Sequence, residues 1–196
     1  MLFVPLSTLG AVEENYTVTI SLTDWSYISV YPAESSLTVY NPDGRFFTGG
    51  GFILDPTSGI PNNFGFTFKY SKHGKPQGNI VYIIRNEEEG TKTRIKSNML
   101  TSAGFLPGNP VGTPTAIAEG KCNVAVYDLL TDEYLGGAGN LNCRLTVEDK
   151  GTSGIDQDTF YLRVLYPDGV PFEPADMKKS EILKGGNIVI HNTTGK

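Results

Sequence analysis

Four carboxylates flank one short loop and have the residue types that bind calcium. Glu148 and Asp149 precede a segment rich in Gly and Ser, and Asp156 and Asp158 follow it. Carboxylates that meet at the base of a loop suit Ca²⁺, a hard cation that prefers oxygen ligands. The spacing is not that of an EF-hand, and aspartates in such loops also accept hydrogen bonds from nearby backbone N–H groups. Two interpretations are therefore open, a calcium site and a set of turn-capping carboxylates.

Cys122 and Cys143 are the only cysteines of the chain. Each lies in a segment of alternating apolar residues, and the glycine-rich segment 136–139 between them predicts a hairpin. A register that pairs Val124 with Leu141 places the cysteines directly opposite each other, where a disulfide can form. We therefore expect a disulfide and, with it, an oxidising compartment. The alternative is a pair of buried free thiols, which behave as small apolar side chains.

Trp25, Tyr27 and Tyr31 form a partly alternating aromatic group. Aromatic strips stack against sugar rings in carbohydrate-binding sandwiches, because the ring faces are apolar and the ring edges polar. The other interpretation is ordinary packing on the face of a strand. A polysaccharide is the ligand that this group of residues suits.

The motifs of common enzyme classes are absent from the sequence. It contains no G-x-S-x-G, no H-E-x-x-H and no phosphate-binding loop. Glu87, Glu88 and Glu89 lie together in a predicted turn, where carboxylates are usually solvated. His73 and His191 are far apart in the sequence. We therefore predict a protein without catalytic activity.

Composition excludes further classes of protein. Of 196 residues, 39% are hydrophobic and 19% are charged, and the net charge is −5. So few charged residues argue against a coiled coil or a charge-rich disordered chain. The 16 Lys and Arg residues against 21 Asp and Glu give no electrostatic basis for binding nucleic acid. No run of about 18 apolar residues is present, so we expect no membrane insertion.

Alternation with a period of two residues dominates the chain and predicts β-strands. It is clearest in residues 16–22, 64–68, 80–85, 122–126, 141–147, 160–166 and 187–191. About ten such strands, with turns rich in Gly, Pro, Asn and Asp, predict an all-β fold: an antiparallel β-sandwich of the Ig-like or jelly-roll-like type. Helical periodicity is nearly absent; only residues 175–183 could form one or two helical turns. Residues 104–118 contain three prolines, and we expect a stiff surface loop there.

Residues 1–44 contain too few strands to form a domain alone, because two or three strands bury little apolar surface. We therefore predict an N-terminal β segment of residues 1–44 and a β-sandwich domain of residues 45–196. The N-terminal segment must complete a sheet, either in its own chain or in another copy. The expected interface consists of the apolar residues at the start of the chain, which are Leu2, Phe3, Val4 and Leu6.

Five segments of the chain match sequence motifs that occur together in one protein family. Residues 46–53 (FFTGGGFI) are similar to the family's F-V-T-G-G-G-W-I, and residues 63–72 (NFGFTFKYSK) to its N-F-G-F-x-x-K-Y-x-K. Residues 158–164 (DTFYLRV) resemble D-x-F-R-I-x-I, and residues 185–191 (GGNIVIH) resemble the terminus G-G-G-x-I-V-I-H. Residues 16–24 (YTVTISLTD) look like the Y-T-V-T-L-T-V-T-D strand of a PKD repeat. Together these segments resemble bacterial secreted and surface proteins in which a C-terminal β-domain follows PKD or Ig-like repeats. The two cysteines depart from the family pattern.

The resemblance implies a secreted or surface-attached β-module that carries no transferable catalytic residue. We therefore expect a structural module of an extracellular assembly. In the strong form of this hypothesis, an N-terminal strand of one subunit completes a sheet of the next, so that filaments grow head to tail. The partners are then other copies of the chain or tandem β-domains of a larger surface protein. The alternative is a carbohydrate-binding or adhesive module of a larger secreted protein.

Overall fold

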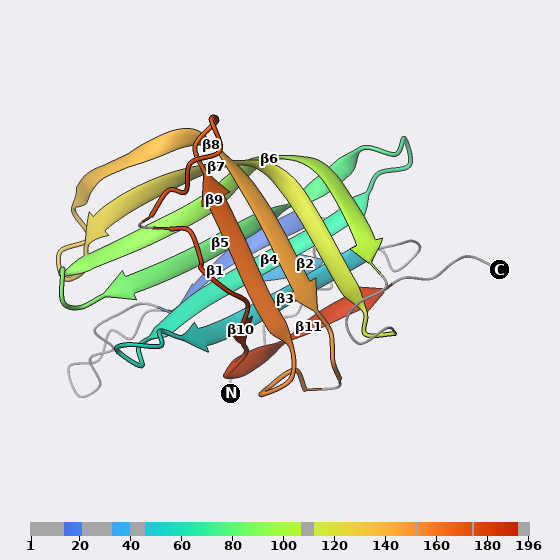
Figure 1. Cartoon of the computed structure of the whole chain (residues 1–196), viewed down its shortest axis with the longest axis horizontal. Coiled ribbons are helices and arrows are strands. Elements are labelled where there is room, and N and C mark those ends of the chain that lie inside the picture. Colours follow the sequence, from blue (N-terminus) through green and yellow to red (C-terminus); the bar gives the residue numbers. More distant parts are fainter. Residues whose placement is uncertain are drawn as a thin grey trace.

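The computed structural model describes residues 14–20, 33–39, 46–106, 112–151, 153–173 and 175–191. These residues form eleven β-strands and no helix, and so include no helix that could cross a membrane (Figure 1). The strands are β1 (Glu14–Ile20), β2 (Ala33–Val39), β3 (Phe46–Leu54), β4 (Pro61–Tyr70), β5 (Pro76–Asn86), β6 (Thr91–Leu106), β7 (Thr115–Asp128), β8 (Tyr134–Glu148), β9 (Thr159–Leu165), β10 (Glu181–Ile182) and β11 (Gly185–His191).

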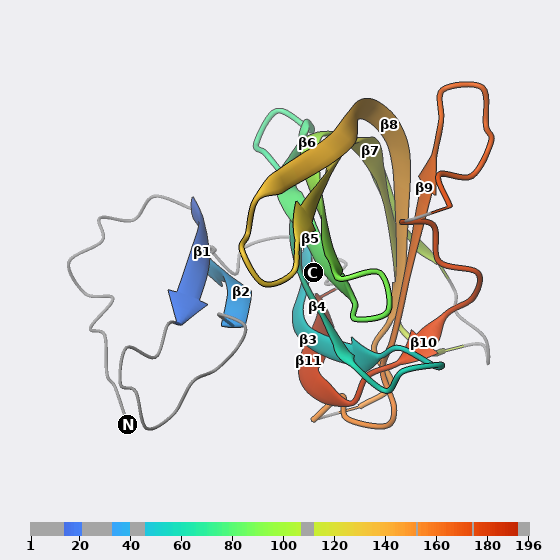
Figure 2. The same cartoon turned by 90° about the vertical axis from the view of Figure 1, so that its left-hand side faces the viewer.

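Nine strands form one antiparallel sheet in the order β10-β9-β8-β7-β6-β5-β4-β3-β11. Strands β3 to β10 follow each other as neighbours, and β11 returns to pair with β3. The sheet curls strongly, so that its opposite halves face each other across one core (Figures 1 and 2). The all-β antiparallel class is thus confirmed. In place of the two separate sheets of a sandwich, a single curled sheet encloses the core.

The curling of the sheet has local causes in its longest strands. Register shifts interrupt the pairing of β6 with β7 between Ser97 and Met99, and the pairing of β7 with β8 between Cys122 and Val124. Such bulges bend a strand and increase its twist. Glycine assists at the seam between β3 and β11, since a Cβ added to Gly51 would lie 2.0 Å from the carbonyl oxygen of Gly185.

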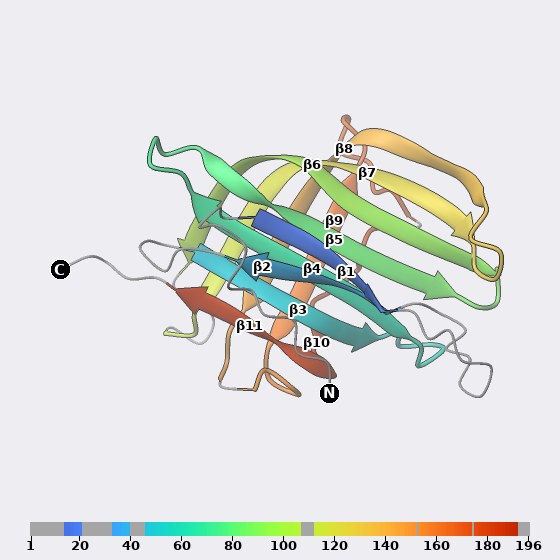
Figure 3. The same ribbon diagram turned by 180° about the vertical axis from the view of Figure 1, so that it is seen from behind.

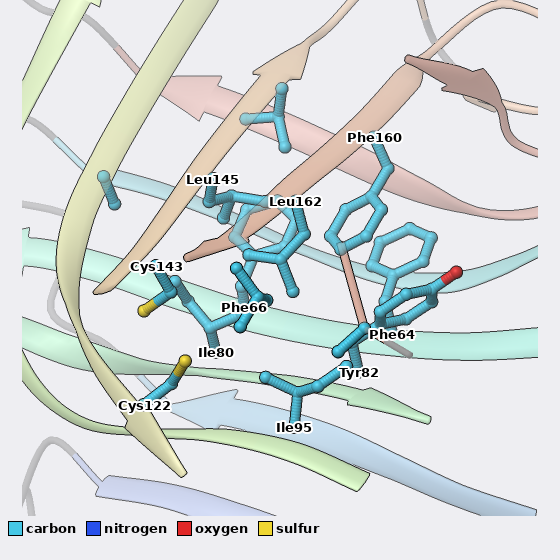
Figure 4. Close-up of a cluster of buried hydrophobic side chains, with 14 of the residues drawn as sticks. Phe64, Phe66, Ile80, Tyr82, Ile95, Cys122, Cys143, Leu145, Phe160 and Leu162 are labelled. Atoms are coloured by element: carbon cyan, nitrogen blue, oxygen red, sulfur yellow. The ribbon is translucent and has the colours of Figure 1, made fainter. Parts of the chain in front are cut away.

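Aromatic side chains fill the interior of the curled sheet. Phe160 on β9 and Phe64 on β4 come from opposite halves of the sheet, and their rings stack with centroids 4.2 Å apart (Figure 4). Phe47 stacks on Phe68 with centroids 4.9 Å apart. The largest fully buried side chains include Phe47, Phe66, Phe68, Phe160, Ile80, Ile95, Leu145, Leu162, Leu183 and Ile188. Their alternation along each strand is the pattern that predicted the strands.

Strands β1 and β2 pair with each other in a separate two-stranded sheet. The antiparallel register runs from Glu14 opposite Val39 to Ile20 opposite Ala33. The pair lies beside β3 and β4, but no backbone ladder joins it to the nine-stranded sheet (Figures 2 and 3). The short strand predicted near Ile28 and Val30 lies outside the described residues.

Two predicted segments differ in the structure. The expected loop of residues 104–118 is shorter, because β6 and β7 continue their pairing as far as Leu106 and Thr115. Residues 175–183 form no helical turn among the described residues. The backbone N–H of Met177 donates instead to the carbonyl oxygen of Leu162, 3.1 Å away on β9. The segment is therefore hydrogen-bonded to the sheet.

Candidate functional site

The outer edge of β11 is covered by two carboxylates. The backbone N–H of Ile188 donates to Oδ2 of Asp158 over 2.9 Å, and that of Ile190 donates to Oδ2 of Asp149 over 3.1 Å. Asp158 is fully buried, and its Oδ1 accepts a hydrogen bond of 2.8 Å from the backbone N–H of Lys150. An edge strand normally presents such N–H groups to any strand that can pair with them. On β11 the two carboxylates accept the hydrogen bonds of these N–H groups, so the groups are not available to another strand.

Calcium binding by this cluster stays a prediction, and its four carboxylates contact donors of the protein. Glu148 accepts from the Thr159 hydroxyl at 2.9 Å and pairs with Lys150 at 2.7 Å, while Asp156 pairs with Lys184. No group of three or more His, Cys, Asp or Glu residues within the described ranges could hold a metal ion. The four carboxylates flank one loop, as predicted, but each is engaged by a donor of the protein. The alternative interpretation, capping of backbone N–H groups, applies to Asp149 and Asp158.

The outer edge of β9 is covered by the segment 171–182, which we call the strap. Backbone N–H groups of the strap donate to β9, from Phe172 to the Val164 carbonyl at 2.9 Å and from Met177 to the Leu162 carbonyl. In return, the N–H of Val164 donates to Oδ1 of Asp176 over 2.8 Å. Strand β10 completes the cover by pairing with the start of β9. Both edges of the nine-stranded sheet are thus protected by segments of the same chain.

The two cysteines are free thiols and not the predicted disulfide. Cys122 pairs with Leu141, and Cys143 pairs with Gly120, so the ladder is offset by two residues from the expected register. The cysteines are therefore diagonal neighbours on the inner face, with their sulfur atoms turned toward each other (Figure 4). Diagonal neighbours across a ladder have Cα atoms about 7–8 Å apart, more than a disulfide usually spans. The pair corresponds to the other interpretation, two buried free thiols.

The thiols are shielded from reaction. A hydrogen bond with Cys143, together with burial, raises the pKa of the Cys122 thiol. The same hydrogen bond lowers the pKa of the Cys143 thiol, so the protection of both thiols rests on their burial, which keeps reagents from either sulfur atom. We therefore expect no labelling of the native chain by a maleimide at neutral pH and two labels per chain in denaturant. Intact-mass spectrometry measures this, and rapid labelling of the native chain would contradict the buried position.

A cavity of about 330 Å³ lies at the end of the curled sheet, between the strap and the ends of β3 and β5. Its lining is mainly apolar and includes Ile53, Ile84 and Met177, with Tyr82 and Asn62 as buried polar groups. Burial raises the pKa of the Tyr82 hydroxyl, which stays protonated at neutral pH. The described residues that line the cavity include no histidine, cysteine or paired nucleophile and base. The cavity can hold an apolar group, but it presents no catalytic constellation.

The remaining predicted site residues lie outside the described ranges. They are the N-terminal interface of Leu2, Phe3, Val4 and Leu6, and the aromatic group of Trp25, Tyr27 and Tyr31. The described part of the N-terminal segment, strands β1 and β2, contributes two outer strand edges instead. No described strand pairs with the outer edge of β1 or with the outer edge of β2.

The sheet edges are the functional feature that sequence reasoning missed. Asp158 and Ile188 are 30 residues apart, and no local signal links an aspartate to the backbone of a distant strand. The edges matter because an unpaired edge is a template for another chain. No protein-family model, curated protein or solved structure matches this chain.

Proposed function

We propose that the chain is a non-catalytic structural module of an extracellular or cell-surface assembly, which polymerises by exchange of N-terminal strands. The contrast between its two sheets carries the proposal. The nine-stranded sheet has both outer edges covered by Asp149, Asp158 and the strap. The two-stranded sheet has outer edges that no described residue pairs with. Among the described residues, one sheet is thus protected at its edges and the other is available for strand addition.

The acceptor in this proposal is the β1–β2 sheet of one copy. A two-stranded sheet is marginal in water, and a third strand adds both backbone hydrogen bonds and buried apolar surface. The donor is the apolar start of another copy, residues 2–6. Pro5 is compatible with such a donor, because proline is tolerated in a strand that pairs along one edge only. Donor and acceptor are different surfaces, so the contact is head-to-tail and propagates into filaments.

Deletion of residues 1–12 tests the proposal. We expect the full chain to form filaments in negative-stain images and the shortened chain to remain a folded monomer in sedimentation velocity. Deletion of residues 192–196 serves as the matched control and should leave filaments intact. A full chain that stays monomeric at high concentration would show the proposal to be wrong.

The competing hypothesis, a carbohydrate-binding or adhesive module, predicts a different result. Affinity electrophoresis in gels that contain cell-wall polysaccharides should retard a carbohydrate-binding module and leave a structural module unaffected. Retardation that is lost on substitution of Trp25 by alanine, together with a monomeric full chain, would favour the carbohydrate-binding hypothesis.

A further inference from the structure

The charges of the chain are unevenly distributed along its sequence. Residues 1–44 contain five of the 21 acidic residues and none of the 16 basic ones. The other sixteen acidic residues equal the sixteen basic residues in number, so the net charge of −5 resides in residues 1–44. The N-terminal segment thus has a net charge of −5, and the domain of residues 45–196 is neutral as a whole.

The domain nevertheless has one cationic face. Along β6 to β9, the inward positions are taken by buried residues such as Ile95, Cys122 and Leu162, and basic residues occupy outward positions between them. We call this surface the basic outer face; it consists of Arg94, Lys96, Lys121, Arg144 and Arg163.

Two of these five cations are neutralised within the described residues. Arg163 pairs with the buried Asp176 at 2.7 Å, and Arg144 lies 3.8 Å from Glu119. In addition, Arg144 and Arg163 are directly opposite each other in the ladder of β8 and β9. Like charges in opposite positions destabilise a sheet.

Arg94, Lys96 and Lys121 form no ion pair with a described residue. Arg94 donates to the Tyr127 hydroxyl at 2.8 Å, and Lys121 donates to Oδ1 of Asn142 at 2.6 Å, so both have neutral partners. Arg94 and Lys96 are exposed. The basic outer face therefore carries about three uncompensated positive charges in a chain whose net charge is negative.

We infer that the basic outer face binds the acidic N-terminal segment, residues 1–44, of another copy of the chain. The inference rests on the proposed assembly and names a second contact within it. The charges are complementary, and the main contacts of the chain's own β1–β2 pair are with β3 and β4. Such contacts steer association and fix orientation more than they add affinity. They also weaken with salt, unlike backbone pairing between strands.

Charge reversal on the face tests the inference. The variant Arg94→Glu, Lys96→Glu, Lys121→Glu is compared with Lys72→Glu, Lys75→Glu, Lys196→Glu, which reverses three lysines outside this face and outside the strap. Sedimentation velocity gives the concentration at which polymers form, and circular dichroism checks that each variant is folded. We expect the face variant to raise this concentration by about tenfold at low salt, and the control to change it by less than about twofold.

A charge-swapped mixture identifies the occupant of the face. The N-terminal variant Glu13→Lys, Glu14→Lys, Asp24→Lys should assemble poorly alone but restore polymers when it is mixed with the face variant. For the unmodified chain, a rise in NaCl from about 50 mM to about 500 mM should weaken assembly by about tenfold.

The outcomes separate this inference from the proposed function. If deletion of residues 1–12 abolishes polymers but face reversal and salt have no effect, the inference is wrong and strand exchange stands. If face reversal weakens assembly but the mixture does not restore it, the occupant is not the N-terminal segment, and the inference is also wrong. If the unmodified chain is monomeric at both salt concentrations, the proposed function itself fails.

Discussion

Replacement of Asp158 by alanine is expected to lower the free energy of unfolding by about 3–5 kcal/mol. The carboxylate is fully buried and accepts backbone hydrogen bonds from Lys150 at 2.8 Å and from Ile188 at 2.9 Å. Its removal leaves the buried N–H of Ile188 and the partly buried N–H of Lys150 without an acceptor, and it breaks the contact between β11 and the loop that covers its edge. A loss of this size is a large part of the stability of a typical domain. Urea denaturation followed by circular dichroism measures it.

Asp168 provides the matched control for this prediction. It is an exposed turn residue that accepts one hydrogen bond of 3.1 Å from the backbone N–H of Val170. Because water can replace this bond, Asp168→Ala should cost less than about 1 kcal/mol. Equal losses for the two aspartates would contradict the assigned role of Asp158 in closing the sheet.

Replacement of Phe160 by alanine is expected to cost about 3–5 kcal/mol. The ring is fully buried and contacts side chains from the opposite half of the curled sheet, with centroid distances of 4.2 Å to Phe64 and 5.3 Å to Tyr82. The substitution removes these contacts and leaves a cavity that the rigid sheet cannot close. The midpoint of urea unfolding should fall accordingly.

Leu130 serves as the control for Phe160. Its side chain is 79% exposed in the turn between β7 and β8, so Leu130→Ala should change stability by less than about 0.5 kcal/mol. If Phe160→Ala were as mild as Leu130→Ala, the two halves of the sheet would not share one core.

The alternation of apolar residues was sufficient to predict most of the strands. The segments around Phe66, Ile80, Leu145 and Leu162 all became strands with the alternating residues buried, because one face of each strand meets the core. Alternation does not reveal which strands belong to one sheet. The pairing of β3 with β11 joins residues more than 130 positions apart, and nothing local in either segment predicts it.

The cysteines show why register is harder to predict than strand position. Both cysteines lie on the inner face, as their alternation predicted. The expected pairing of Val124 with Leu141 fails because the ladder of β7 and β8 is offset by two residues, which places Leu141 opposite Cys122. A further shift between Cys122 and Val124 pairs Val124 with Ala138. On the other strand, Asn140 has a φ of 57°, a conformation that asparagine tolerates better than most residues. A shift of this kind leaves the alternation of each strand nearly intact, so the sequence does not reveal it.

The carboxylates around this loop show that the partners of a site residue are as hard to predict from sequence as strand register. Their position around one loop was correct, but Asp158 and Asp149 accept from backbone groups of β11, about 30 to 40 residues further along the chain. A carboxylate that caps an edge strand and one that binds calcium have the same sequence signature. Only the closed sheet, which brings β11 to this loop, distinguishes them.

Amide hydrogen exchange at increasing protein concentration tests most directly whether the two sheets differ in their edges. We expect β1 and β2 to gain protection as polymers form, because their outer edges become paired. Strands β9 and β11 should be equally protected in monomers and polymers, since the strap, Asp149 and Asp158 already cover them. Gain of protection in β9 or β11 on assembly, with no change in β1 and β2, would contradict this difference between the two sheets.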